Sequence, residues 1–282
     1  MKHIFLNLKR FDISPANGGV NRLAPLPNWG PYIVEQTQQH LAQFSAKSVE
    51  FVMYMPEAHI MAAAAALTPN SPIRLGSQSV YREDTATGGN FGAFTTNRTA
   101  NIVKELGCQN TLIGHCEERN DKMGILREVG ITDTAAVNRI LNKEILAAQA
   151  AGLSVLYCVG ENSDEQQNWE QVLGDQLAIG LAGTDQSKIV IAYEPIWSIG
   201  PGKTPASKEY ITKIARFIKE KTGGIDVVYG GGLKKDNAGM LADIAEIDGG
   251  LIALTRFQGE IGFYPEEYIE IIEEYLGRVK TL

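Results

Sequence analysis

Residues 189–207, IVIAYEPIWSIGPGKTPAS, form the stretch around which the rest of the sequence is organised. The stretch begins with a short run of apolar, mostly β-branched residues, which is typical of a buried parallel strand. The run ends at Glu194, and Pro195 follows at once, so an acid is expected at a sheet edge where it can meet a ligand. The loop Pro195–Thr204 combines an apolar tip with glycines and prolines, and this predicts a lid. On its own, the glutamate also fits an ordinary turn with a solvated side chain.

Length and composition limit the class of protein. The chain has 282 residues, 44% of them hydrophobic, and a formal net charge of −7, which argues against nucleic acid or an anionic membrane as the main partner. No apolar run approaches 18 residues, and the N-terminal apolar patch is too short for a signal peptide. The three cysteines, Cys108, Cys116 and Cys158, have no metal-like spacing. We therefore expect a cytoplasmic protein without a metal site.

Strands and helices are predicted to alternate along the whole chain. The predicted strands lie at 3–8, 49–54, 73–77, 111–114, 154–159, 189–193, 226–229 and 250–254. The predicted helices lie at 32–44, 58–67, 97–106, 135–151, 165–181, 207–222, 236–245 and 265–276. Eight such repeats predict an α/β fold, a single (β/α)8 barrel over residues 1–282. An open doubly wound sheet is the alternative, but no glycine fingerprint follows the first strand. The long loop after that strand is predicted to be a surface insertion.

Polar residues gather where the predicted strands end. In a (β/α)8 barrel these ends build one face, so the side chains are expected to converge on one mouth. Each alone also fits a solvated, capping or backbone-bonded residue, but their joint placement favours an active site. The residues are Asn7, Lys9, His115, Glu117, Glu194 and the run Tyr229–Gly232.

This set of side chains suits proton transfer next to a carbonyl group. A carboxylate can remove a C–H proton if an imidazole and an ammonium group hold the developing enediolate oxygen. No cofactor is needed for this chemistry. The sequence has no His and carboxylate pair at helix spacing for a metal and no Ser/His/Asp set for acyl transfer.

Four motifs resemble those of the triosephosphate isomerase family, in the same order along essentially the whole chain. The most specific is AYEPIWSIGPGKT at 192–204, which is similar to the family's sixth strand and lid. IGHCEER at 113–119 resembles the strand-four motif, and Asn7-Leu-Lys9 the first-strand motif. Tyr229–Gly232 is similar to the strand-seven turn. Residues 92–95, GAFT, resemble the tip of the third loop, which in the family inserts into a partner subunit.

The resemblance implies a role for each matching residue. Glu194 is expected to be the catalytic base and His115 the neutral electrophile. Lys9 and Asn7 are expected to stabilise the oxyanion, with Glu117 orienting Lys9.

The same resemblance implies a lid, a phosphate site and a dimer. The expected lid residues are Pro195, Ile196, Trp197, Lys203 and Thr204, and the expected phosphate-binding N–H groups are those of Gly200, Gly231 and Gly232. A homodimer through the loop Asn90–Thr95, a small phosphorylated sugar as substrate and no cofactor are also implied.

Departures from the family pattern concern the substrate. Gly232 stands where the family has a phosphate-binding serine, and Ala253-Leu254 stands in place of a Gly-Gly pair. Arg256, just beyond, is a candidate compensating ligand because arginine suits phosphate, although an exposed arginine at a helix entry is the alternative. Elsewhere, Cys116 replaces a serine and Glu118 an arginine.

Three functions stay open at the level of sequence. The favoured one is an aldose–ketose isomerase interconverting dihydroxyacetone phosphate and D-glyceraldehyde 3-phosphate, as in glycolysis and gluconeogenesis. The second is the same chemistry on another small sugar phosphate, such as a tetrulose phosphate. The third, a non-catalytic ligand-binding barrel, is disfavoured by the intact set of Glu194, His115 and Lys9.

Overall fold

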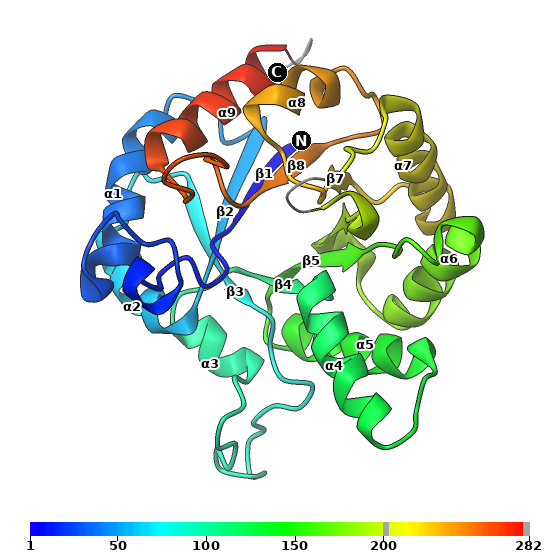
Figure 1. The fold of residues 1–282 in the computed structure, drawn as a ribbon. Coiled ribbons are helices and arrows are strands. Elements are labelled where there is room, and N and C mark those ends of the chain that lie inside the picture. The colour runs from blue at the N-terminus through cyan, green and yellow to red at the C-terminus, as the bar shows by residue number, and fades with distance from the viewer. Residues whose placement is uncertain (200–202, 279–282) are drawn as a thin grey trace.

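The computed structural model describes residues 1–199 and 203–278, and in these residues eight parallel strands close into a barrel in chain order (Figure 1). Strand β1 pairs with both β2 and β8, which closes the ring. The strands are β1 (Lys2–Asn7), β2 (Val49–Met55), β3 (Ile73–Gln78), β4 (Asn110–Ile113), β5 (Ser154–Val159), β6 (Ile189–Tyr193), β7 (Val227–Tyr229) and β8 (Gly249–Ile252). The predicted barrel is confirmed.

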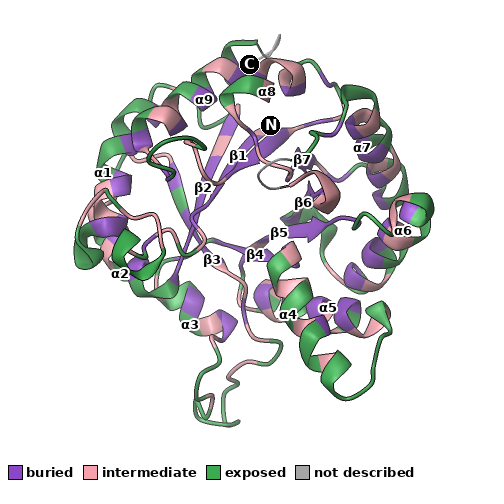
Figure 2. Cartoon of the chain, viewed as in Figure 1, coloured by how far each residue is buried: buried purple, intermediate pink, exposed green. Residues whose placement is uncertain are grey.

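Helices surround the barrel and turn their buried faces towards it (Figure 2). Helix α7 is typical: Ser207 caps its first turn by accepting the Tyr210 N–H, and its buried face repeats at Ile211, Ile214 and Ile218. The helices are α1 (Trp29–Leu41), α2 (Glu57–Ala66), α3 (Ala100–Glu105), α4 (Cys116–Glu128), α5 (Thr134–Ala150), α6 (Trp169–Gly180), α7 (Lys208–Thr222), α8 (Lys235–Ala242) and α9 (Pro265–Arg278). None of them, within the described part of the chain, is both long and apolar enough to cross a membrane.

The core has two parts because the strands are buried on both faces. One cluster fills the barrel interior, and the larger one lies between the barrel and the helices. The interior cluster consists of Phe5, Val52, Tyr54, Leu112, Leu156, Cys158, Ala192, Val228 and Leu251. The interior is therefore packed, and a ligand can enter only at the ends of the strands.

Helix α4 is the one element of this set that the sequence prediction omitted. It begins directly after His115, and its only buried residue is Met123. A helix with so little buried apolar surface has no 3.6-residue hydrophobic period to detect. The eighth strand was also predicted too long, because it ends at Ile252 and leaves Ala253 and Leu254 in the following loop.

Two loops at the mouth of the barrel contact each other. The loop after β1 runs from residue 8 to 28, as expected for an insertion, and contains two short 3-10 turns. Its Arg22 donates a hydrogen bond to the carbonyl of Ile261, in the loop between β8 and α9, at 3.1 Å. A third long loop, residues 79–99, projects from the barrel between β3 and α3 and is largely exposed (Figures 1 and 2).

Candidate active site

Glu194 lies directly after β6 and is buried, with 1% of its surface exposed. Its Oε2 accepts the N–H of Cys116 at 3.1 Å. Its Oε1 has no hydrogen-bond partner among the described residues, although it lies 3.1 Å from Nε2 of His115. Burial raises the pKa of Glu194, against the opposing effects of His115 and Lys9. The result is a carboxylate held more basic than an exposed one, with one oxygen uncommitted.

His115 is placed by the start of α4. It is the N-cap residue, and its Nδ1 accepts the backbone N–H of Glu117 at 3.3 Å. A backbone N–H can only donate, so Nδ1 is the unprotonated nitrogen and the neutral ring carries its proton on Nε2. That nitrogen faces Glu194. His115 can therefore donate a hydrogen bond at the point where Glu194 can accept a proton.

Lys9 is fixed in place by two other predicted residues. Its ammonium group pairs with Glu117 at 2.7 Å, and its backbone N–H donates to Oδ1 of Asn7 at 3.0 Å. Its φ of 39° lies in the left-handed region, which is uncommon for a residue with a side chain and is found at functional sites. Burial acts to raise the pKa of Glu117, but the hydrogen bond and charge of Lys9 lower it overall. The pair is therefore an ion pair at neutral pH.

A cavity of about 570 Å³ opens beside these side chains. Asn7, Lys9 and His115 are part of its lining, and the loop after β1 contributes Phe11 and Ile13. Asn7, Lys9 and His115 are thus brought together at the C-terminal ends of the strands, where barrels of this type bind ligands. Glu194 contacts His115 but is not part of the cavity lining.

The strand-seven turn lies next to the buried acid. A Cβ on Gly230 would come within 2.8 Å of Cγ of Glu194, so only glycine allows this approach. Gly231 lies against Pro195 at the start of the lid, where a Cβ would be 3.0 Å from Cγ. Gly232 has a φ of 96°. The turn therefore begins beside Glu194 and continues beside Pro195, the first residue of the predicted lid.

The first residues of the predicted lid contact a buried acid that sequence reasoning missed. Oε1 of Glu161 accepts hydrogen bonds from Nε1 of Trp197 at 2.8 Å, from the Tyr193 hydroxyl at 2.9 Å and from the Tyr210 hydroxyl at 3.1 Å. Burial raises the pKa of Glu161, while these three donors lower it. Pro195 is buried and Ile196 and Trp197 are half-buried, whereas Lys203 and Thr204 are exposed. Gly200 lies outside the described residues.

Arg256 already has partners in the structure. Its Nε donates to Glu267 at 2.7 Å, and its guanidinium lies 3.7 Å from the centre of the Tyr264 ring. Tyr264 lies in the loop between β8 and α9, and Glu267 lies in the first turn of α9. The candidate phosphate ligand thus already has an acidic and an aromatic partner within the protein.

Glu118, which departs from the family pattern, has its own set of partners. It accepts hydrogen bonds from Ser79, from the Gly114 N–H at 2.6 Å and from Lys122 at 2.8 Å. Burial acts to raise the pKa of Glu118, but Lys122, Ser79 and the Gly114 N–H lower it overall. Lys122 also pairs with Glu144 at 3.0 Å. A buried charge network therefore supports the turn that carries His115.

One group of donors in the described residues has the spacing of a metal site: atoms of His115, Cys116 and Glu194 lie within 4.8 Å of one another. Burial and the nearby charge of Glu194 together raise the pKa of Cys116 to about 12. A thiol must lose its proton to bind a metal, so this environment disfavours it as a ligand. The cluster suits proton transfer better.

Two supporting residues could have been found from the sequence by a stricter search of strand ends. Gln78 ends β3 and donates hydrogen bonds to Oδ1 of Asn7 at 3.3 Å and to the carbonyl of Lys9 at 3.1 Å. Glu161 follows β5 after a single glycine. Both are polar residues at carboxyl ends of parallel strands, the same signal that identified His115.

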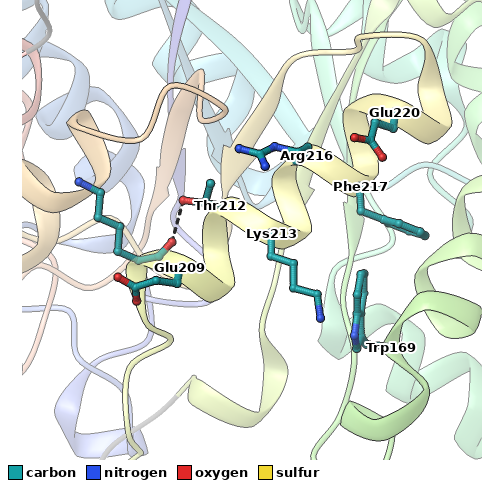
Figure 3. Close-up of a pocket in the computed structure, with 8 residues that line it drawn as sticks. Trp169, Glu209, Thr212, Lys213, Arg216, Phe217 and Glu220 are labelled. Atoms are coloured by element: carbon teal, nitrogen blue, oxygen red, sulfur yellow. Dashed lines mark hydrogen bonds between the residues drawn. The ribbon is translucent and has the colours of Figure 1, made fainter.

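A second hollow, of about 550 Å³, lies on the outer side of α7 (Figure 3). Trp169 of α6 meets Phe217 edge to face there, with ring centres 4.9 Å apart, and the Lys213 ammonium lies 4.4 Å from the centre of the Trp169 ring. The Thr212 hydroxyl donates a hydrogen bond to the carbonyl of Lys208. None of the predicted catalytic residues lines this hollow.

Comparisons with known proteins agree with this geometry. The sequence model of the family described as triosephosphate isomerase matches residues 31–274. A triosephosphate isomerase of Synechocystis sp. is 33% identical over 236 residues, covering 82% of this chain and 87% of that protein. One of Alkalilimnicola ehrlichii is 30% identical over 253 residues, covering 85% and 91%.

A solved structure supports the fold independently. The crystal structure of triosephosphate isomerase from Bartonella henselae superposes with a TM-score of 0.72 and covers 98% of this chain and 99% of its own, at 22% sequence identity. The closed barrel, the residues gathered at its mouth and the two sequence comparisons have one common explanation: this chain belongs to the triosephosphate isomerase family.

Proposed function

We propose that this protein is an aldose–ketose isomerase that interconverts dihydroxyacetone phosphate and D-glyceraldehyde 3-phosphate. The observation that carries the proposal is the buried Glu194 carboxylate, whose Oε1 lies 3.1 Å from Nε2 of His115 in a member of this family. The curated relatives are named for the same reaction.

The proposed reaction moves one proton between neighbouring carbons. Glu194 takes the proton from the carbon next to the carbonyl, and the C–H electron pair forms the double bond of an enediolate. The Nε2–H of His115 and the ammonium of Lys9 stabilise the negative charge on oxygen, with Asn7 as a further donor. The hydroxyl proton passes from one oxygen of the enediolate to the other, next to Nε2 of His115, and Glu194 returns its proton to the other carbon. Substrate and product have the same atoms, so no cofactor is consumed.

The pKa directions support these roles. A base must be ionised yet basic enough to remove a carbon-bound proton, and burial raises the pKa of Glu194 in that sense. The residues Pro195, Ile196, Trp197, Lys203 and Thr204 are proposed as the lid that excludes water from the enediolate. Gly231 and Gly232 are proposed to present N–H groups to the phosphate, and Gly200 is proposed on the basis of resemblance alone.

We further propose that the working form is a homodimer through the loop Asn90–Thr95. The tip of this loop is exposed, with Phe91 93% accessible. The cavity beside Lys9 and His115 offers an apolar side at Phe11 and Ile13 for the same loop of a second copy. We also propose that residues 1–282 act as one barrel domain in the cytoplasm, where thiols such as Cys108 and Cys158 stay reduced.

The test is a coupled assay of purified protein with D-glyceraldehyde 3-phosphate and with a tetrulose phosphate. We expect turnover of the triose phosphate, with kcat/KM at least tenfold higher than for the tetrulose phosphate. Faster turnover of the tetrulose phosphate would show that the preferred substrate is a tetrulose phosphate. Folded protein that turns over neither would support the non-catalytic barrel instead.

A further inference from the structure

The substrate phosphate lacks some of its expected partners in this chain. Gly232 has no hydroxyl, and the side chains of Ala253 and Leu254 stand in place of a glycine pair. Arg256 is engaged by Glu267 and Tyr264. A phosphate monoester carries up to two negative charges, so another cation near the strand-seven turn would offset the loss.

Lys234 lies beside that turn. A Cβ on Gly232 would be 3.4 Å from Cε of Lys234, so the lysine stem runs back along the glycine. The chain in between is rigidly held, since Asn237 accepts the Lys234 N–H at 2.8 Å and donates to the Gly232 carbonyl at 2.9 Å. Leu233 donates its N–H to the carbonyl of Leu251 at 2.9 Å, which ties the turn to β8. Lys234 therefore has a defined position between the loops after β7 and β8.

The ammonium group of Lys234 has no acidic partner within ion-pair distance among the described residues. It lies 4.1 Å from the centre of the Phe257 ring instead. Burial lowers the pKa of Lys234, only partly opposed by Asp236. The next residue, Lys235, is exposed and pairs with Glu270 at 2.8 Å. A partly buried cation without a counter-ion is costly, and an anion bound beside it would remove that cost.

The neighbours of Lys234 place it on the phosphate side of the candidate site. Along the turn, Gly230 approaches Glu194, Gly231 approaches the lid residue Pro195, and Gly232 approaches Lys234. The loops after strands seven and eight, together with the start of a helix, are where (β/α)8 barrels commonly bind phosphate. Lys234 is the residue immediately before α8.

We propose that Lys234 is a phosphate-binding residue of this isomerase, and that its ammonium group replaces the missing hydroxyl and glycine contacts. This inference rests on the proposed function. The side chain meets the phosphate between the loops after β7 and β8, and the Phe257 ring covers the ammonium group on one side.

The experiment compares Lys234→Met with Lys235→Met, which removes an identical charge one residue away from a lysine already paired with Glu270. For Lys234→Met we expect KM for D-glyceraldehyde 3-phosphate and the inhibition constant of inorganic phosphate to rise about 10- to 100-fold, as for loss of a charge-assisted hydrogen bond. Lys235→Met should differ from the parent by less than about twofold. Lys234→Arg should restore part of the affinity. Thermal melting of each variant shows whether it is folded.

The outcomes separate this inference from the proposed function. Titration calorimetry with inorganic phosphate measures the site even if the parent protein is not a triose phosphate isomerase. If Lys234→Met matches Lys235→Met in both KM and phosphate affinity, the inference is wrong while the isomerase function stands. If Arg256→Ala weakens phosphate binding and Lys234→Met does not, the residue that binds the phosphate is Arg256. A folded parent protein that neither isomerises nor binds phosphate contradicts both.

Discussion

At the scale of single residues, the proposed active site holds a group whose burial costs stability. Glu194 is enclosed, and its Oε1 has no hydrogen-bond partner in the described chain. A buried carboxylate of this kind resists ionisation, and the folded protein bears that cost whenever the group is charged. The uncommitted oxygen is also the one that can accept a proton from a substrate.

Replacing Glu194, the proposed base, with its neutral isostere should reveal both the catalytic role and the cost of burial. We expect Glu194→Gln to lower kcat by about 10²- to 10⁴-fold, the usual contribution of general base catalysis. The exposed Glu220→Gln, on α7, is the matched control and should keep full activity. Activity of Glu194→Gln close to that of the parent would show that another group is the base.

The same variant should be more stable at alkaline pH. The folded-state pKa of Glu194 is raised, so its neutral form is favoured by the fold and stability is lost as pH rises through that pKa. Glutamine stays neutral, so Glu194→Gln should melt at a higher temperature than the parent at pH 8. The difference should shrink as pH falls towards 4.5. A variant that melts at a lower temperature at pH 8 would contradict the assigned direction of the pKa shift.

At the scale of elements, the start of the proposed lid is hydrogen-bonded to a buried acid of the barrel, Glu161. Glu161 follows β5, and the groups that donate to it come from the end of β6, from the lid and from α7. Trp197 also packs edge to face on Tyr210, with ring centres 5.5 Å apart. The start of the proposed lid is therefore held by contacts that involve the loop after β5, the end of β6 and helix α7.

Removing one donor from this junction should alter lid movement without changing the catalytic groups. Trp197→Phe keeps the aromatic packing but loses the 2.8 Å hydrogen bond to Glu161. We expect kcat and KM to change together, and kcat/KM to fall about 3- to 30-fold. Trp169→Phe, on α6, makes the same substitution away from the lid and should leave steady-state kinetics unchanged. If the two variants have the same kcat and KM, the hydrogen bond between Trp197 and Glu161 does not contribute to catalysis.

At the scale of the whole molecule, one loop stands out from the barrel. Its base is closed by Arg98, whose Nε donates to the carbonyl of Ser79 at 3.0 Å, and Phe94 packs on Tyr81 inside it. Phe91 at its tip is almost fully exposed. A large apolar side chain presented on a fixed loop is costly in water and suits insertion into a second copy.

Charging the tip of this loop should weaken the proposed dimer. Each copy would bury one Phe91 side chain, worth about 2 kcal/mol, so Phe91→Asp should raise the dimer dissociation constant by at least about 100-fold. Met61→Asp is the control because Met61 is 68% exposed on α2, on the outside of the barrel. Sedimentation velocity over a concentration series measures the dimer dissociation constant of each variant. A parent protein that is monomeric at tens of micromolar contradicts the proposed dimer.

Much of the fold followed from local patterns. Apolar runs of strand length alternating with amphipathic helices predicted the closed barrel, because each run could only be buried between helices and interior. Helix α4 was not predicted, because Met123 is its only buried residue and no hydrophobic period marks it in the sequence. At the site, Asn7, Lys9, His115 and Glu194 were found because parallel strands bring their carboxyl ends to one face.

The sequence by itself determined the barrel, the acid at the end of the sixth strand and the polar residues at the other strand ends, since these depend on periodicity and order along the chain. Only the tertiary structure decided which groups are partnered. Arg256 is engaged by Glu267, eleven residues later, whereas Lys234 meets the aromatic ring of Phe257 and no acid among the described residues. Charge pairing depends on distances between side chains from separate loops, and no pattern along the chain encodes those distances.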